Sequence, residues 1–279
     1  MRKLILFLLL TCSAFSEKYT ISVASIFQNE ARFLKEWIDY NIIIGVEHFW
    51  LYNNQSTDDY MNVLQPYIDS GVVELEEWPN LWPEIPFAWG CQAYAYQDAL
   101  NKCRRKTKWL AIIDVDEFIV PLDCYSLKET LKKHYNRYSG VCIHWQCFGT
   151  SNVDYVHPEE LMIERLTMKA ITSSPHNGWY KSIFKVDHVE TILNPHFPQY
   201  KPGKYPVNTN KEKNFLEANV MIKHLQINHY WTRDQYHLQT VKLPRYINWK
   251  ASEESILKKA SDLNEVQDVS ILKFIPLMR

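Results

Sequence analysis

Strand-like and helix-like segments alternate over residues 19–113, and this alternation constrains the fold more than any other feature of the sequence. β-rich or apolar runs occupy residues 19–27, 48–52, 72–76 and 109–113. Helical patterns fill the intervals, at residues 30–41, from the polar cluster 53–58 to about 68, and at 87–106. Asn29 is expected to cap the first of these helices. Strands alternating with helices of this length predict an α/β fold with a mostly parallel central sheet covered by helices on both faces.

The second half of the chain is less regular. Residues 126–129 form a capping box that predicts a helix to about residue 135, and residues 141–146 and 183–189 are strand-like. Four prolines predict a loop over residues 194–210, and residues 232–235 are expected to cap a last long helical region. Without repeats or linkers, residues 17–279 are expected to form one domain, with a ligand-binding half (17–120) and an irregular, substrate-specific half (121–279).

Charge and glycine content exclude several classes of protein. Lys and Arg number 31 against 32 Asp and Glu, a net charge of −1, which argues against a nucleic-acid partner. The seven glycines form neither GxGxxG nor GxxxxGK. Any nucleotide phosphate must therefore be held by something other than a glycine-rich loop.

Residues 1–16 have the pattern of a signal peptide. Arg2 and Lys3 precede a wholly apolar stretch, and small residues mark a cleavage site after Ser16. The apolar run of about 12 residues is shorter than the roughly 20 that a membrane span needs, so export without a stable transmembrane anchor is expected. A buried first strand or helix is the alternative. Five cysteines lie beyond residue 16, and none of them forms a CxxC motif. The sequence does not decide between disulfides and buried, reduced thiols.

The apolar run at 109–113 ends in three carboxylates, Asp114, Asp116 and Glu117. Ligands of open α/β sheets bind at the carboxyl ends of the strands. In extended backbone Asp114 and Asp116 would point the same way, and two like charges held together need a cation between them. Mg²⁺ or Mn²⁺ fits such oxygen ligands and would bridge to a diphosphate. A solvated acidic turn is the alternative.

Two further groups are candidates for the same site. The polar cluster at residues 53–58 also follows a strand and could bind a base or ribose, or simply start a helix. His229 and His196 could each complete a metal shell, although single histidines are more often structural.

Taken in order, these motifs resemble the GT-A glycosyltransferases, and within them family 92. The matching segments span roughly residues 20–245: Asn29-Glu30, residues 36–38, 45–56, 66–71, 109–118, 145–151, 181–183, 196–197 and 228–230.

The resemblance implies a GT-A fold and an enzyme that moves a sugar, galactose in the first instance, from a UDP-sugar to a glycan acceptor with inversion. It implies that Asp116 is the main ligand of Mn²⁺ (or Mg²⁺), and that Asp114 contacts the ribose or the metal's water shell. It also implies a Golgi-like lumen, where nucleotide sugars are available. The uridine pocket would be lined by Asn29, Asn53, Ser56 and Asp58.

A carboxylate is needed to deprotonate the acceptor hydroxyl. By analogy of position the candidates are Asp154, Glu159 and Glu160. Two other classes of function compete with the transferase. One is a non-catalytic carbohydrate- or nucleotide-binding protein of the same fold. The other is a metal-dependent phosphoesterase, which lacks a second His and Asp cluster here.

Overall fold

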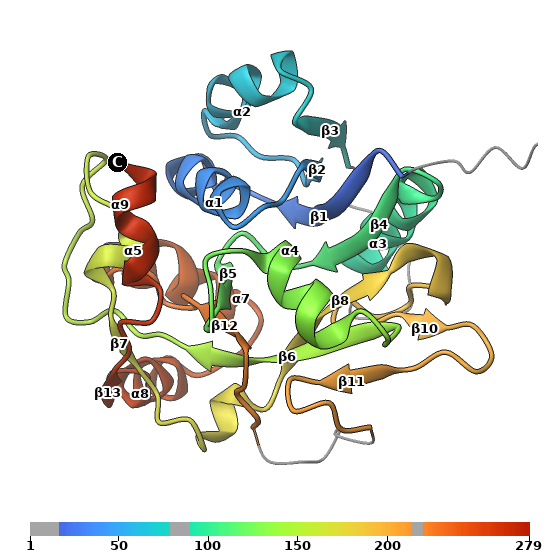
Figure 1. Cartoon of the computed structure of the whole chain (residues 1–279). Helices are drawn as coiled ribbons and strands as arrows, with labels where there is room; N and C mark the ends of the chain where they lie inside the picture. The colour runs from blue at the N-terminus through green and yellow to red at the C-terminus, as the bar shows by residue number, and fades with distance from the viewer. Residues whose placement is uncertain (1–16, 79–89, 214–219) are drawn as a thin grey trace, which may run out of the picture.

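The computed structural model describes residues 17–78, 90–213 and 220–279. In this part of the chain nine strands form one twisted sheet. Eight of them follow the order β3-β2-β1-β4-β8-β6-β12-β5, and β11 pairs with the first residues of β6, Gly140–Cys142 (Figure 1). Strands β3, β2, β1 and β4 are parallel, whereas β8 is antiparallel to both of its neighbours. The α/β class with a mostly parallel sheet is confirmed.

The first half follows the predicted alternation closely. Its strands are β1 (Tyr19–Phe27), β2 (His48–Asn53), β3 (Val73–Glu77) and β4 (Thr107–Ile112). Its helices are α1 (Ala31–Ile43), α2 (Tyr60–Asp69) and α3 (Gly90–Cys103). Residues 87–89 of the third predicted helix lie outside the described residues.

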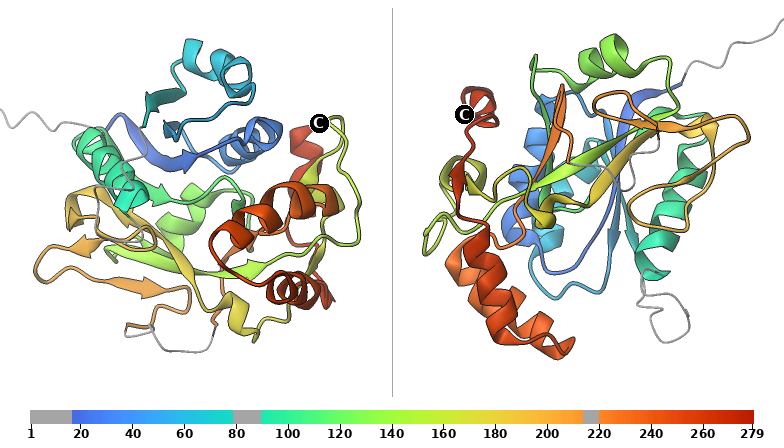
Figure 2. Two further views of the ribbon diagram at one scale, coloured as in Figure 1. Left: turned by 180° about the vertical axis from the view of Figure 1, so that it is seen from behind. Right: turned by 90° about the horizontal axis from the view of Figure 1, so that it is seen from below.

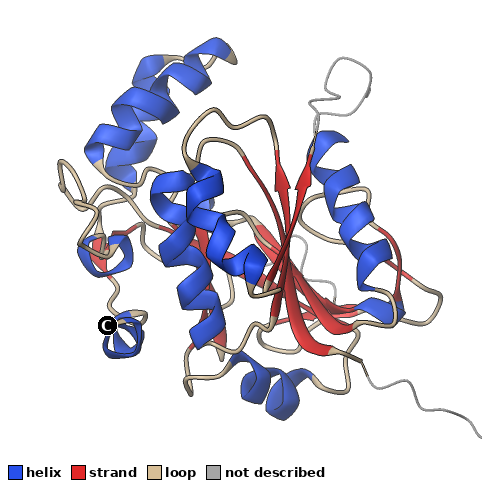
Figure 3. Ribbon diagram, turned by 90° about the horizontal axis from the view of Figure 1, so that it is seen from above, coloured by secondary structure: helices blue, strands red, loops and turns tan. Residues whose placement is uncertain are grey.

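Two cores form because successive strand residues face opposite sides of the sheet. Val23 and Phe49 belong to the larger apolar cluster, which includes buried residues of α1, whereas Ala24 and Trp50 belong to the cluster that includes buried residues of α3. Figure 3, viewed along the sheet, shows helices on both of its faces. A sheet covered on both faces buries its strands completely, which is why β2 is buried at every position.

The second half supplies the remaining strands of the sheet: β5 (Glu117–Pro121), β6 (Gly140–Cys147), β8 (Tyr180–Lys185), β11 (Pro206–Asn208) and β12 (Leu225–His229). Two small pairs lie outside it, β9 (Val189–Thr191) with β10 (Gln199–Tyr200), and β7 (Met168–Lys169) with β13 (Val266–Gln267). Chain segments far apart in sequence therefore meet in this half.

Short helices complete this half: α4 (Leu127–Thr130), α5 (Met162–Arg165), α6 (Gln235–His237), α7 (Leu243–Asn248), α8 (Glu253–Asp262) and α9 (Ile275–Met278). Helices α7 and α8 lie beside each other away from the sheet, as Figure 2 shows from behind and from below. Single 3-10 turns occupy Pro175–Asn177, Val186–His188 and Leu272–Phe274.

The predicted capping box is present, since the Ser126 hydroxyl accepts from the backbone N–H of Glu129 at 3.2 Å. Beyond α4 the helix continues as a π-helical segment, Leu131–Tyr135. The last helical region begins within the predicted capping segment, residues 232–235. Asp234 is the cap of α6, and a second π-helical segment, Leu238–Lys242, interrupts the region before α7.

Two other boundaries differ from the predictions. The strand predicted at 183–189 begins earlier, as β8, and ends at Lys185 in a 3-10 turn. The proline-rich segment is not only loop, because β10 and β11 lie within it. Pro206 is the first residue of β11, the position of a strand where the missing N–H of proline is tolerated.

The signal-peptide prediction lies outside the described residues. Among the residues that are described, no helix is long and apolar enough to cross a membrane. Cys103, Cys124, Cys142 and Cys147 form no disulfide among the described residues.

A carboxylate in α1 links the folding free energy to pH. Glu36 accepts backbone N–H bonds from Met162 and Ile163, each at 2.9 Å, and so holds the start of α5. Burial raises the pKa of the Glu36 carboxyl to about 7, against the effect of these two bonds. Between its unfolded pKa and pH 7 the folded state therefore binds one more proton than the unfolded chain, and the free energy of unfolding falls as pH rises.

We predict that Glu36→Gln removes this fall, on the order of 3 kcal/mol, although the variant loses one acceptor for α5. Urea unfolding at pH 4.5, 6 and 7.5 measures the free energy of unfolding. Glu129→Gln, at an exposed position, is the control. The stability of the variant relative to wild type should increase with pH across this window. A difference independent of pH would contradict the assignment.

Candidate active site

The three carboxylates that follow β4 lie in a tight turn. The backbone N–H of Glu117 donates to the carbonyl of Asp114 at 3.0 Å, and the N–H of Asp114 donates to the Glu117 side chain at 2.9 Å. The expected extended backbone is therefore wrong at this point, because the chain turns here from β4 into β5. We call residues 114–117 the acidic turn.

Asp114 is held by groups from α3 and β8. One carboxylate oxygen accepts from the Gln92 amide at 2.6 Å and from the Tyr96 hydroxyl at 3.0 Å, while the other lies 3.0 Å from the ammonium of Lys181. Burial alone would lower the pKa of Lys181, but Asp114 and Glu117 outweigh it and the pKa is raised. Lys181 is therefore a buried cation that stays charged.

Asp116 has different partners. Its carboxylate lies 3.1 Å from the Lys242 ammonium and 3.6 Å from Nε2 of His229. Burial would raise the pKa of Asp116, yet Lys242 and His229 hold it well below its usual range. For His229, burial lowers the pKa despite the neighbouring carboxylate, so the imidazole is neutral near pH 7 and can act as a ligand.

Glu117 is completely buried at the start of β5. Its Oε2 lies 3.9 Å from Lys181, and its Oε1 has no hydrogen-bond partner among the described residues. Burial raises the pKa of this carboxyl well above its usual range, with Lys181 opposing the shift. Glu117 serves to lock the turn through the N–H of Asp114 rather than to face solvent.

A second ion pair lies next to Asp116. The buried guanidinium of Arg233 donates to Glu30 at 2.6 Å and lies over the ring of Phe33, 3.7 Å from its centroid. The pKa of Glu30 is raised, because burial and the nearby Asp116 together outweigh the opposing effect of Arg233. The start of α1 and the segment after β12 are thus electrostatically coupled to the acidic turn.

Aromatic rings adjoin the acidic turn on the β6 and β8 side. The Trp145 ring centroid lies 4.3 Å from that of His229 and 5.6 Å from that of His196, and Trp179 lies 4.7 Å from His196. Burial and the charge of Lys181 lower the pKa of His196 to about 4. Trp179 is half exposed and presents an apolar face to solvent.

The four predicted uridine-pocket residues lie together, at the carboxyl ends of β1 and β2. The N–H of Asn29 donates to the Ser56 hydroxyl at 2.9 Å, and Asn53 accepts from the N–H of Ser56 at 2.9 Å. Asp58 accepts from the N–H of Ala31 at 2.7 Å. Asp58 therefore satisfies the start of α1, and the expectation that Asn29 caps this helix is wrong, since Asn29 has a φ of 57° and no capping bond to it.

The three candidate bases lie on the segment between β6 and α5, and Asp154 and Glu159 are exposed. The carbonyl of Asp154 accepts from the N–H of Tyr236 at 2.9 Å, which places Asp154 beside α6. Tyr236 lies three residues after Arg233. Glu160 instead accepts from the N–H of His157 and pairs with Arg165 at 3.4 Å. No hydrogen bond or ion pair between described residues joins any of the three to the acidic turn.

The donor chemistry of the acidic turn suits a divalent cation. Asp114 and Asp116 offer carboxylate oxygens and His229 a neutral imidazole, the ligand types of Mg²⁺ and Mn²⁺ sites. Within the described ranges these three do not converge as a ready-made set of ligand atoms within 4.8 Å of one another. The ammonium groups of Lys181 and Lys242 neutralise the two aspartates in this structure.

Several residues of this site were not singled out from the sequence. Lys181 carries only a weak signal: it lies just before the strand predicted at 183–189, and lysine is almost never fully buried without a charged partner. Lys242, Arg233 and Glu30 carry no comparable local signal. They reach the acidic turn only through long-range packing.

The family model of glycosyltransferase family 92 matches residues 17–269. The chain belongs to glycosyltransferase family 92. This membership and the observed sheet agree with the predicted GT-A type of fold.

Curated family 92 proteins match part of the chain. One from Ricinus communis is 27% identical over 178 residues, which are 63% of this chain and 30% of that protein. One from Oryza sativa subsp. japonica is 29% identical over 116 residues, 42% of this chain and 19% of that protein. The matched segments thus span less than a third of the length of these relatives.

Among solved structures, Staphylococcus aureus TarS (residues 1–349) matches at a TM-score of 0.38 with 13% identity, covering 60% of this chain and 47% of TarS. Glucosyl-3-phosphoglycerate synthase of Mycobacterium tuberculosis, solved with Mn²⁺ and UDP-glucose, matches at 0.29 with 18% identity, covering 46% of this chain and 44% of that one. These scores are low, and the family assignment rests on the family model.

We predict that Lys181→Met destabilises the protein by about 3 kcal/mol or more, because it leaves Asp114 and the buried Glu117 without their cation. Urea unfolding at pH 7 measures this loss. The control is Lys128→Met, which removes a surface pair with Glu47 at 3.5 Å and should cost no more than about 1 kcal/mol. Equal, small losses in both variants would contradict the proposed role of Lys181.

Proposed function

We propose that this protein is a metal-dependent glycosyltransferase that moves a sugar from a UDP-sugar to a glycan acceptor with inversion. Galactose is the sugar that we propose. The observation that carries the proposal is the acidic turn at the carboxyl end of β4, next to the polar loops that follow β1 and β2. Membership of family 92 supports the reaction class.

The nucleotide would bind across the ends of β1, β2 and β4. Asn29, Asn53, Ser56 and Asp58 would line the uridine pocket, and Asp114 would contact the ribose or the water shell of the metal. Support comes from their proximity and from Asp58 Oδ1, a buried oxygen with no partner among the described residues. The internal bonds of Asn53 to Ser56 and Glu77 mean that its amide shapes the loop as well.

Mn²⁺ or Mg²⁺ would be held by Asp116 and Asp114, with His229 as a further ligand. Such an ion, when bound, supplies positive charge that neutralises the charge developing on the departing UDP. Lys181 and Lys242 already place ammonium groups beside the same aspartates, and ammonium groups also bind phosphate oxygens. The chain therefore concentrates cationic groups where a diphosphate would be positioned.

The acceptor would bind on the side of the 121–279 half. Trp145 and Trp179 offer ring faces of the kind that pack against sugars. Asp154, Glu159 or Glu160 would deprotonate the acceptor hydroxyl. Of the three, Asp154 is adjacent to the segment that carries Arg233, and Glu30 joins the candidates because its pKa is raised beside Asp116.

We predict that Asp116→Asn abolishes the metal-dependent part of UDP binding while the protein stays folded. Isothermal titration with UDP, with and without Mn²⁺, measures binding, and circular dichroism checks the fold. Asp154→Asn, which lies outside the acidic turn, is the matched control and should bind UDP like wild type. Binding to Asp116→Asn that still responds fully to Mn²⁺ would overturn the metal assignment.

We further predict that replacing the base lowers kcat by about 10² to 10⁴-fold with little change in UDP affinity. The variants are Asp154→Asn, Glu159→Gln, Glu160→Gln and Glu30→Gln. They are assayed for sugar transfer to a panel of glycan acceptors and, in parallel, for UDP-sugar hydrolysis. If all four retain wild-type kcat, the base lies elsewhere.

A non-catalytic carbohydrate- or nucleotide-binding protein of the same fold is the competing proposal. It predicts UDP binding without transfer or hydrolysis by the wild-type chain for any donor in a panel of UDP-sugars.

The main proposal also includes delivery of the protein to a secretory, Golgi-like lumen by a signal peptide at residues 1–16. Amino-terminal sequencing of the mature protein tests it, and an uncleaved Met1 would count against it.

A further inference from the structure

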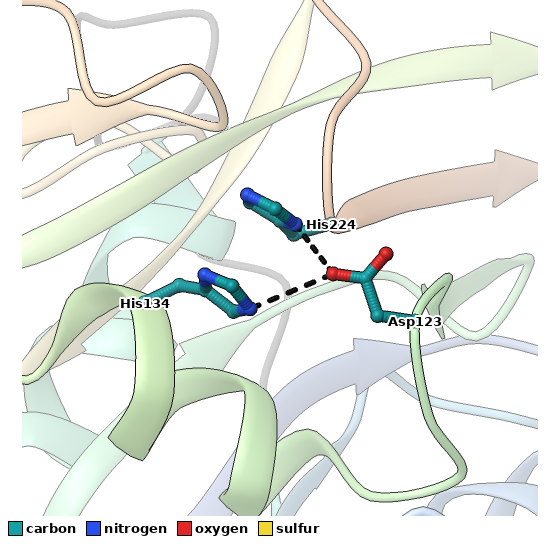
Figure 4. Close-up of side chains that lie close together, drawn as sticks. All are labelled: Asp123, His134 and His224. Atoms are coloured by element: carbon teal, nitrogen blue, oxygen red, sulfur yellow. Dashed lines mark hydrogen bonds and ion pairs between the residues drawn. The ribbon is translucent and has the colours of Figure 1, made fainter.

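A cluster of two histidines and an aspartate lies at the other end of β5 from the acidic turn. Asp123, His134 and His224 each offer a ligand atom, and these atoms all lie within 4.8 Å of one another. Figure 4 shows the three side chains pointing toward one another from three separate segments. Strand β5 has five residues, so the two sites are separated by roughly 15 Å of strand.

The distances within the cluster are short. Oδ2 of Asp123 lies 2.5 Å from Nδ1 of His224 and 3.5 Å from Nε2 of His134. The two imidazole rings stack with centroids 3.7 Å apart and an angle of 14° between their planes. Asp123 is 45% exposed, whereas the histidine side chains are 16% and 11% exposed, so one carboxylate faces water and two imidazoles line the protein side.

Packing fixes the segments that carry these side chains. The N–H of Leu122 donates to the carbonyl of His224 at 2.9 Å, which holds the segment after β5 against the start of β12. The hydroxyl of Tyr135, the residue after His134, donates to the carbonyls of Thr209 at 2.8 Å and Lys223 at 3.4 Å. All three ligand atoms are therefore positioned by the sheet and its neighbouring segments.

The backbone at His224 adopts a conformation that favours glycine. Its φ is 63°, and the N–H of Leu225 donates to the carbonyl of Lys223 at 2.7 Å, which makes His224 the central residue of a γ-turn with positive φ. Such a conformation is unfavourable in a residue other than glycine and persists only where the surrounding structure enforces it. Here it directs the imidazole toward Asp123.

We propose that Asp123, His134 and His224 form a second divalent-metal site of the zinc class, distinct from the acidic turn. Two imidazole nitrogens and one carboxylate oxygen suit Zn²⁺, and the exposed side of Asp123 leaves room for water as a fourth ligand. The Nδ1 atom of His224, which contacts Asp123 in this structure, would bind the ion as the unprotonated nitrogen of its ring, with the ring proton on Nε2. The ion ties together the segment after β5, the π-helical segment Leu131–Tyr135 and the start of β12.

The test is a titration of the metal-free, full-length protein with Zn²⁺ in competition with a chromophoric chelator. Wild type should bind one Zn²⁺ at this site, and His224→Asn should bind it on the order of 100-fold or more weakly, since even loss of an outer-shell partner costs about 10–100-fold. Asparagine tolerates the positive φ of this position, so the backbone is preserved. His157→Asn, an exposed histidine outside the cluster, should bind like wild type.

Asp116→Asn separates the two sites and should keep the zinc site intact. Should His224→Asn fail to fold, His134→Gln, in a helical backbone, makes the same comparison. The proposal is overturned if wild type and His224→Asn (or His134→Gln) bind Zn²⁺ equally, if wild type binds none, or if Asp116→Asn alone removes binding. In those cases the cluster is a hydrogen-bonded Asp–His pair with a stacked ring.

Discussion

The burial of acidic side chains beside lysines at the carboxyl end of β4 is the interaction on which the rest of the site depends. A carboxylate taken out of water costs several kcal/mol unless an opposite charge accompanies it. Lys181 reaches Asp114 from β8, and Lys242 reaches Asp116 from the segment before α7. The acidic turn can therefore form only when the second half of the chain has packed onto the first.

Most of the fold was predictable where the signal is local. The first four strands and their helices follow from apolar periodicity, and each lies within a few residues of its predicted bounds. The irregular half was less predictable, because β8 pairs antiparallel between β4 and β6, segments that are not adjacent to it in sequence. The π-helical interruption at Leu238–Lys242 has no distinctive composition. Such features are decided by tertiary packing rather than by propensity.

In the candidate site, too, the features with a local sequence signal were predictable and those that depend on long-range contacts were not. The strand end with its carboxylates was predictable from residues 109–118 alone, and so was the grouping of polar residues after β2. The turn at Asp114 was not, because it depends on the Glu117 side chain folding back to accept the N–H of Asp114. The capping of α1 by Asp58 was missed for a related reason: donor and acceptor are 27 residues apart. Charge partners from distant strands leave no periodic pattern.

The most direct test of the central claim is a crystal soaked with Mn²⁺ and UDP, with the metal located by its anomalous scattering. The account predicts an anomalous peak contacting the Asp116 carboxylate and the diphosphate, with the base against the loop that holds Asn53 and Ser56. A UDP molecule bound at that edge with no metal beside it, or bound away from the acidic turn altogether, would contradict it.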